Sequence, residues 1–99
     1  MKCVGLFFRP AEAQARAMEL TPGDKLTLKA EPTNEFDPNA VMVFTEDDVH
    51  IGYVPKEDAP FFKGVDPLPT GIFQEFVQLE GSSAVHLYFD LEEAKADDA

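Results

Sequence analysis

Cysteine, positive charge and long apolar runs are scarce in this 99-residue chain. Its one cysteine, Cys3, excludes an intramolecular disulfide and any metal site built from cysteines, which fits a reducing, cytoplasmic setting. No apolar run approaches the roughly 18 residues that a membrane-spanning helix requires, so we expect no membrane partner. The N terminus lacks the small-residue cleavage site of a secretory signal and predicts a first strand instead, with Cys3 buried in it.

The shortage of positive charge limits the kinds of partner. Eight Lys and Arg face 19 Asp and Glu, for a formal net charge of −11. Part of this charge lies in residues 91–99, which we expect to form an acidic, disordered tail behind a single domain at 1–90. Such a surface repels phosphate backbones at long range, so any nucleic-acid function has to be local.

The residues of common catalytic and metal sites are also poorly placed. His50 and His86 lie far apart with no second histidine at ligand spacing, and Ser82 and Ser83 lie in a glycine-containing turn without a neighbouring histidine. No glycine-rich phosphate loop is present. We therefore expect no metal, no cofactor and no enzymatic activity.

The apolar residues that are present predict a mainly-β domain. Nine Phe and a 44% apolar fraction exclude a wholly disordered chain. Alternating or buried apolar runs predict five or six strands that curl into a small sheet or barrel, with one or two short helices. The expected strands cover residues 3–8, 25–31, 39–45, 49–55, 72–80 and 84–91. We expect a helix at 10–20, a type II turn at Pro22–Gly23 and a short helix beginning near Glu57.

The polar segment "EPTNEFDPNA", residues 31–40, joins two of these strands and is called the corner loop below. Asn and Asp side chains often bond backbone N–H groups in turns, so Asn34, Asp37 and Asn39 fit a well-made corner. The same residue types also bind ligands, and Phe36 offers a ring beside them. From these residues alone both interpretations stay open.

The ends of two other strands favour the interpretation of the corner loop as part of a ligand-binding site. Phe7, Phe8 and Arg9 close the first strand, and Tyr53 and Lys56 end the fourth. If a small barrel brings these ends to the corner loop, they supply rings for bases and cations for phosphates. Those are the components of a pocket for single-stranded nucleic acid.

The order of these residues resembles the HIRAN domain family. "GDKLTLKAEPTNEFDPNAVMV" is followed by "IGYVP", and together they match the family signature in order and spacing from Gly23 to Pro55. "VGLFF" upstream is similar to the family's opening strand. The resemblance implies a compact barrel of OB-like or SH3-like character. It also implies a domain of the kind found in fork-remodelling ATPases and nucleases and as standalone bacterial or phage proteins.

The resemblance further implies that the corner loop binds the 3′-hydroxyl end of single-stranded DNA. By matching positions, Asp37 would accept a hydrogen bond from the terminal 3′-hydroxyl, and Asn34 would support it. Phe8 and Phe36 would stack on or flank the terminal bases.

The remaining implied contacts involve the DNA backbone. Tyr53 and Lys56 would lie near it. The DNA-binding member of the family has an arginine before its first-strand aromatic residue, where this chain has Phe7, and here Arg9 comes two positions later.

We therefore predict a non-catalytic, monomeric module for single-stranded DNA ends, in DNA repair, replication or recombination. The alternative is an acidic protein-binding adaptor, or a phage-type inhibitor that mimics DNA toward a basic protein partner and keeps the fold without binding DNA. The positions of the lysines and arginines relative to Phe8 and Asp37 distinguish the two.

Overall fold

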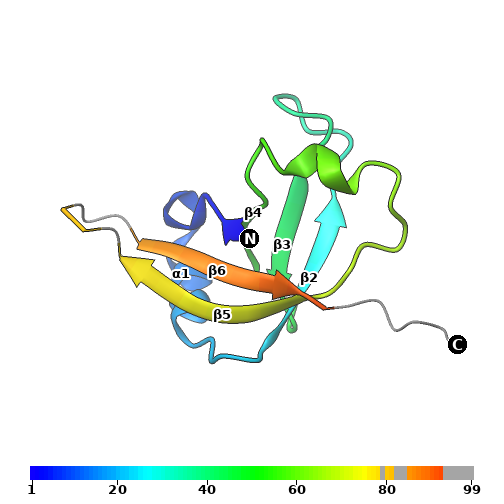
Figure 1. The fold of residues 1–99 in the computed structure, drawn as a ribbon. Helices are drawn as coiled ribbons and strands as arrows, with labels where there is room; N and C mark the ends of the chain where they lie inside the picture. The colour runs from blue at the N-terminus through cyan, green and yellow to red at the C-terminus, as the bar shows by residue number, and fades with distance from the viewer. Residues whose placement is uncertain (79, 82–84, 93–99) are drawn as a thin grey trace, which may run out of the picture.

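The computed structural model describes residues 1–78, 80–81 and 85–92, and within these it contains one six-stranded antiparallel sheet. The strand order is β1-β6-β5-β2-β3-β4, and the sheet curls into a nearly closed barrel (Figure 1). The elements are β1 Lys2–Cys3, η1 Leu6–Phe8, α1 Ala11–Met18, β2 Lys25–Ala30, β3 Val41–Thr45, β4 His50–Tyr53, η2 Ala59–Phe62, β5 Gly71–Gln78 and β6 Val85–Leu91, where η marks a 3-10 helix. The predicted mainly-β barrel is confirmed.

The barrel closes where the chain after β1 meets β4. Val4 and Tyr53 exchange both backbone hydrogen bonds, each with an N–O distance of 2.8 Å. Gly52 lies buried at this seam, where a Cβ would stand 2.5 Å from the Val4 carbonyl oxygen and 2.6 Å from the Cys3 Sγ. The seam therefore depends on the absence of a side chain at residue 52.

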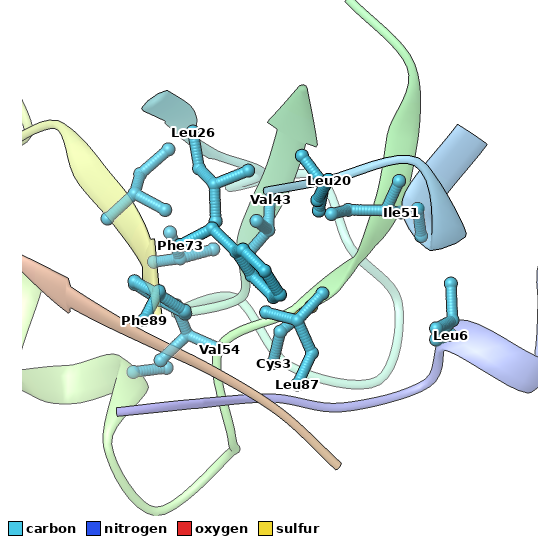
Figure 2. Close-up of a cluster of buried hydrophobic side chains, with 14 of the residues drawn as sticks. Cys3, Leu6, Leu20, Leu26, Val43, Ile51, Val54, Phe73, Leu87 and Phe89 are labelled. Atoms are coloured by element: carbon cyan, nitrogen blue, oxygen red, sulfur yellow. The ribbon is translucent and has the colours of Figure 1, made fainter. Parts of the chain in front are cut away.

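Alternation along the strands fills the barrel interior. In β2 the inward side chains Leu26 and Leu28 are buried, and in β3 the buried positions are Val41, Val43 and Thr45. Figure 2 shows these strands contributing to one cluster with β1, β4, β5 and β6. The labelled members are Cys3, Leu6, Leu20, Leu26, Val43, Ile51, Val54, Phe73, Leu87 and Phe89. Burial raises the pKa of the Cys3 thiol to about 12, as expected for a structural cysteine.

The first strand is shorter than the sequence pattern predicts. The prediction ran through residue 8, but the strand ends at Cys3 and residues 6–8 form η1. Gly5 has a φ of 84°, a left-handed conformation that glycine adopts readily and that breaks the extended chain. Phe7, Phe8 and Arg9 consequently lie on and after a tight helical turn.

The other helices and turns follow the predictions more closely. α1 begins directly after Pro10, within the predicted range. Gly23 has a φ of 97°, and the Asp24 amide donates to the Thr21 carbonyl over 2.9 Å, as in a type II turn. The predicted short helix near Glu57 is a 3-10 helix that begins two residues later, at Ala59. Neither α1 nor the 3-10 helices of the described residues are long and apolar enough to cross a membrane.

The last hairpin, β5–β6, has the predicted strands with a bulge between Phe73 and Glu75. Its predicted turn at Ser82 and Ser83 lies outside the described residues. β6 continues through Leu91, and the Glu92 amide donates to the Thr70 carbonyl over 2.7 Å. The first two residues of the expected tail therefore belong to the barrel, and 93–99 lie outside the described residues.

We expect Gly52→Ala to destabilise the protein by about 3 kcal/mol, at the upper end for overpacking, because its methyl group meets backbone at the seam. Urea unfolding monitored by circular dichroism measures this change. The control Thr27→Ala, at an exposed site on β2, should change the unfolding free energy by less than about 0.5 kcal/mol. Equal unfolding free energies for Gly52→Ala and the control would contradict the close approach of Gly52 to Val4 at the seam.

Candidate nucleic-acid interface

A cavity of about 340 Å³ lies between the corner loop and the barrel seam, and we call it the loop cleft. Figure 1 shows the corner loop projecting from the end of β2 and β3 where η2 also lies. The cleft is lined by Val4, Asn34, Phe36, Asp37, Ala40, Tyr53, Val54 and Lys56. Five of the seven predicted site residues are thus brought together: Asn34, Phe36, Asp37, Tyr53 and Lys56.

Asn34 organises the corner loop. Its Oδ1 accepts hydrogen bonds from the amides of Phe36 (2.8 Å) and Asp37 (2.9 Å). Its Nδ2 donates to Glu31 Oε1 over 2.7 Å. The loop ends are joined where the Glu31 amide donates to the Ala40 carbonyl over 2.9 Å. The corner interpretation is therefore correct for Asn34, which also lines the cleft, and the ligand-binding interpretation stays a prediction.

Asp37 uses only part of its carboxylate for the loop. Oδ1 accepts from the Asn39 amide over 2.9 Å, while the Asp37 carbonyl accepts from the Ala40 amide over 3.0 Å. Within the described part of the chain, Oδ2 accepts no hydrogen bond. A half-buried carboxylate with one open oxygen on a cleft wall is an acceptor for a ligand hydroxyl.

Glu31 is a residue of this region that the sequence analysis did not single out. Its Oε1 accepts from Asn34 Nδ2 and from the Tyr53 hydroxyl, the latter over 3.0 Å. The Asn34 bond is the main cause that lowers the pKa of Glu31, and the Tyr53 bond adds to it. Because the folded-state pKa is the lower one, the stabilisation is present above the unfolded pKa and is lost as the pH falls through the folded value.

A row of ring contacts extends from Tyr53 along the outer face of the sheet. The His50 ring meets Tyr53 edge-on at 5.0 Å and stacks on Phe44 at 4.9 Å, between ring centroids. Lys29 Nζ lies over the Phe44 ring of this row, 4.4 Å from the ring centroid. Burial, followed by the charge of Arg9, lowers the pKa of His50, so the imidazole is neutral at pH 7. These ring contacts help to hold the Tyr53 side chain in its orientation.

Phe8 and Arg9 lie beside the loop cleft but do not line it. Phe8 is 93% exposed and lines a second cavity of about 160 Å³, which shares Val4 with the loop cleft. Arg9 donates from Nε to the His50 carbonyl over 3.0 Å, which fixes its guanidinium near Tyr53. The two predicted stacking residues, Phe8 and Phe36, therefore line different cavities that share Val4.

Four further cations are divided between the region of the cleft and the opposite end of the strands. Lys56 lines the loop cleft, and Lys63 lines a third cavity that shares Ala40 with it. Arg16 and Lys29 instead pair with the β3–β4 turn, Arg16 with Asp47 at 3.0 Å and Lys29 with Asp48 at 3.4 Å. Lys56 therefore lies in the cleft wall and Arg9 lies close to Tyr53, whereas Arg16 and Lys29 are paired at the β3–β4 turn.

A nearly closed antiparallel barrel with a mainly apolar, ring-lined cleft at one end is an architecture found among small nucleic-acid-binding domains. The chain belongs to the HIRAN domain family, whose model matches residues 2–66. At the level of the family this means DNA binding. The crystal structure of the HIRAN domain of human HLTF is similar, with a TM-score of 0.62 and 18% identity over 89% of this chain and 70% of that chain. No curated protein sequence matches.

We expect Asn34→Ala to loosen the corner loop, because it removes the acceptor of two amides and the donor to Glu31. The amides of Phe36 and Asp37 should exchange with solvent at least about tenfold faster, and the protein should lose about 1–2 kcal/mol of unfolding free energy. Hydrogen exchange followed by NMR measures the first effect. The exposed neighbour Thr33→Ala is the control, and equal exchange in both variants would show that Asn34 does not hold the loop.

Proposed function

We propose that this protein binds the 3′-hydroxyl end of single-stranded DNA in the loop cleft. The observation that carries the proposal is the convergence of an exposed ring, an open carboxylate oxygen and a cation, from Phe36, Asp37 and Lys56, on one cavity. A terminal nucleotide has a base face that can stack on Phe36, a hydroxyl that can donate to Asp37 and a phosphate that can pair with Lys56.

Phe36 supplies the stacking surface. Its side chain is 88% exposed although it is a large apolar group, and its backbone is held by Asn34. A base that stacks on such a ring contributes on the order of 1–3 kcal/mol. Phe8 is also exposed and lines the adjacent cavity, so in this proposal it stacks on a neighbouring base rather than the same one.

Asp37 supplies the preference for a free end. Its open Oδ2 accepts a hydrogen bond from a 3′-hydroxyl, and hydrogen bonds to a charged acceptor are the stronger kind. A 3′-phosphate at the same point places two negative groups together and is repelled. Glu31, close behind on the same loop, increases that repulsion.

Lys56 and Arg9 supply the phosphate contacts. Two cations in an otherwise acidic protein neutralise one or two phosphates, so the affinity depends on salt with a log–log slope of about −0.7 for each phosphate contacted. The same proposal includes no catalytic step: the protein captures the end as a cytoplasmic monomer and serves DNA repair, replication or recombination.

The wild-type protein should bind a short 3′-hydroxyl strand about tenfold more tightly than the same strand with a 3′-phosphate, from the charge-assisted bond at Asp37. Asp37→Asn keeps an oxygen for the Asn39 amide and should bind the two strands within about threefold of each other. Fluorescence anisotropy at low salt measures both ratios. Equal binding of the two strands by the wild type would refute end recognition. Absence of binding to both would favour the protein-binding alternative that the charge of −11 suggests.

We expect Phe36→Ala to weaken binding of the 3′-hydroxyl strand about tenfold, because it removes one stacking surface. Phe61→Ala is the matched control, since Phe61 is 76% exposed on η2 and does not line the loop cleft. The control should bind as the wild type does. Equal losses in the two variants would indicate non-specific contact with exposed rings.

A further inference from the structure

The Glu31 carboxylate connects two parts of the barrel through a single oxygen. It stands just beyond the end of β2, and its Oε1 accepts from Asn34 in the corner loop and from Tyr53 in β4. Both donors line the loop cleft, one from the corner loop and one from β4. One side chain therefore ties these two parts of the cleft lining together.

The bond to Asn34 also fixes which way its amide faces. With Nδ2 held by Glu31 at 2.7 Å, Oδ1 points to the amides of Phe36 and Asp37. If the amide were reversed, its nitrogen would face two N–H donors and both bonds would be lost. Glu31 thus determines the backbone geometry of the two residues that the proposed function uses most.

The bond to Tyr53 fixes the part of the cleft lining that β4 supplies. The Tyr53 hydroxyl donates its only proton to Glu31, and the His50 ring contacts the Tyr53 ring edge-on. Burial and the carboxylate of Glu31 together raise the pKa of Tyr53, so the hydroxyl keeps that proton at neutral pH. Toward a ligand, Tyr53 presents its ring and an acceptor rather than a donor.

We propose that Glu31 is the positioning residue of the loop cleft: it touches no DNA itself but sets the places of Phe36, Asp37 and Tyr53 through its two hydrogen bonds. This inference rests on the proposed function for its ligand, yet the geometry it describes exists in the free protein. It also accounts for a carboxylate beside a site for DNA, where charge alone disfavours one.

The variants Glu31→Ala, Glu31→Gln and Glu35→Ala separate positioning from charge. Glu31→Ala removes both bonds and should weaken binding of the 3′-hydroxyl strand about tenfold. Glu31→Gln keeps an acceptor oxygen without the charge and should bind within about twofold of the wild type. Glu35→Ala removes an exposed carboxylate of the same loop and should bind as tightly as the wild type or more tightly. If charge alone matters, Glu31→Ala also binds more tightly, and the proposal is overturned.

Amide exchange in the free protein tests the inference without DNA. The Phe36 and Asp37 amides should exchange about tenfold faster in Glu31→Ala and at nearly wild-type rates in Glu31→Gln. If the wild type binds neither strand, the proposed function fails while this measurement still decides the role of Glu31. Should Glu31→Ala not fold, the shorter Glu31→Asp draws the carboxylate away from Asn34 and Tyr53, and faster exchange at both amides is expected. Unchanged exchange at both amides in Glu31→Ala, or in Glu31→Asp where it replaces that variant, overturns the proposal.

Discussion

The pair of backbone hydrogen bonds between Val4 and Tyr53 is the interaction on which the rest of this structure depends. Without it the six strands of the described chain would form an open sheet with free edges at β1 and β4. With it, the turn η1 is brought against β4, and Tyr53 becomes a wall of the loop cleft. The absence of a side chain at Gly52 makes this approach possible, so the site and the fold share one steric requirement.

The corner loop shows how a polar segment can be both structural and available to a ligand. Asn34 uses both of its side-chain polar atoms for hydrogen bonds within the loop. Asp37 uses one carboxylate oxygen in the same way, and Phe36 takes part in the loop hydrogen bonds only through its backbone amide. Under the proposed function, support of this kind would lower the ordering cost of binding, since hydrogen bonds already hold Phe36 and Asp37 in place. A small number of contacts can then suffice in a protein whose overall charge opposes DNA.

Much of the barrel could be predicted from local pattern. Alternation in β2 and the apolar run of β3 identify their strands because burial follows the strand period of two. The end of the first strand could not, since it depends on the left-handed conformation of Gly5, which nothing in its neighbours reveals. A glycine inside an apparent strand was the one available signal.

For the candidate site, the sequence identified the residues of the corner loop but not how they divide their tasks. Glu31 was missed because its bond to Tyr53 joins residues 22 positions apart, a relation that only the folded barrel creates. The sequence predicts Phe8 and Phe36 as rings of one pocket, whereas in the structure they line two cavities that share Val4. Side-chain types predict what chemistry is present, and the register of the closed sheet decides which groups share a cavity.

The loop holds residue 36 by its amide alone, and this has an evolutionary consequence. Since Asn34 accepts a hydrogen bond from the backbone amide of residue 36, the conformation of the loop does not depend on which side chain this residue carries. Exchange of that side chain alters the surface offered to a ligand while the folding of the barrel is unaffected. Ligand preference and stability are thus free to diverge independently, so that one architecture can be retuned for different partners by single replacements at its tip.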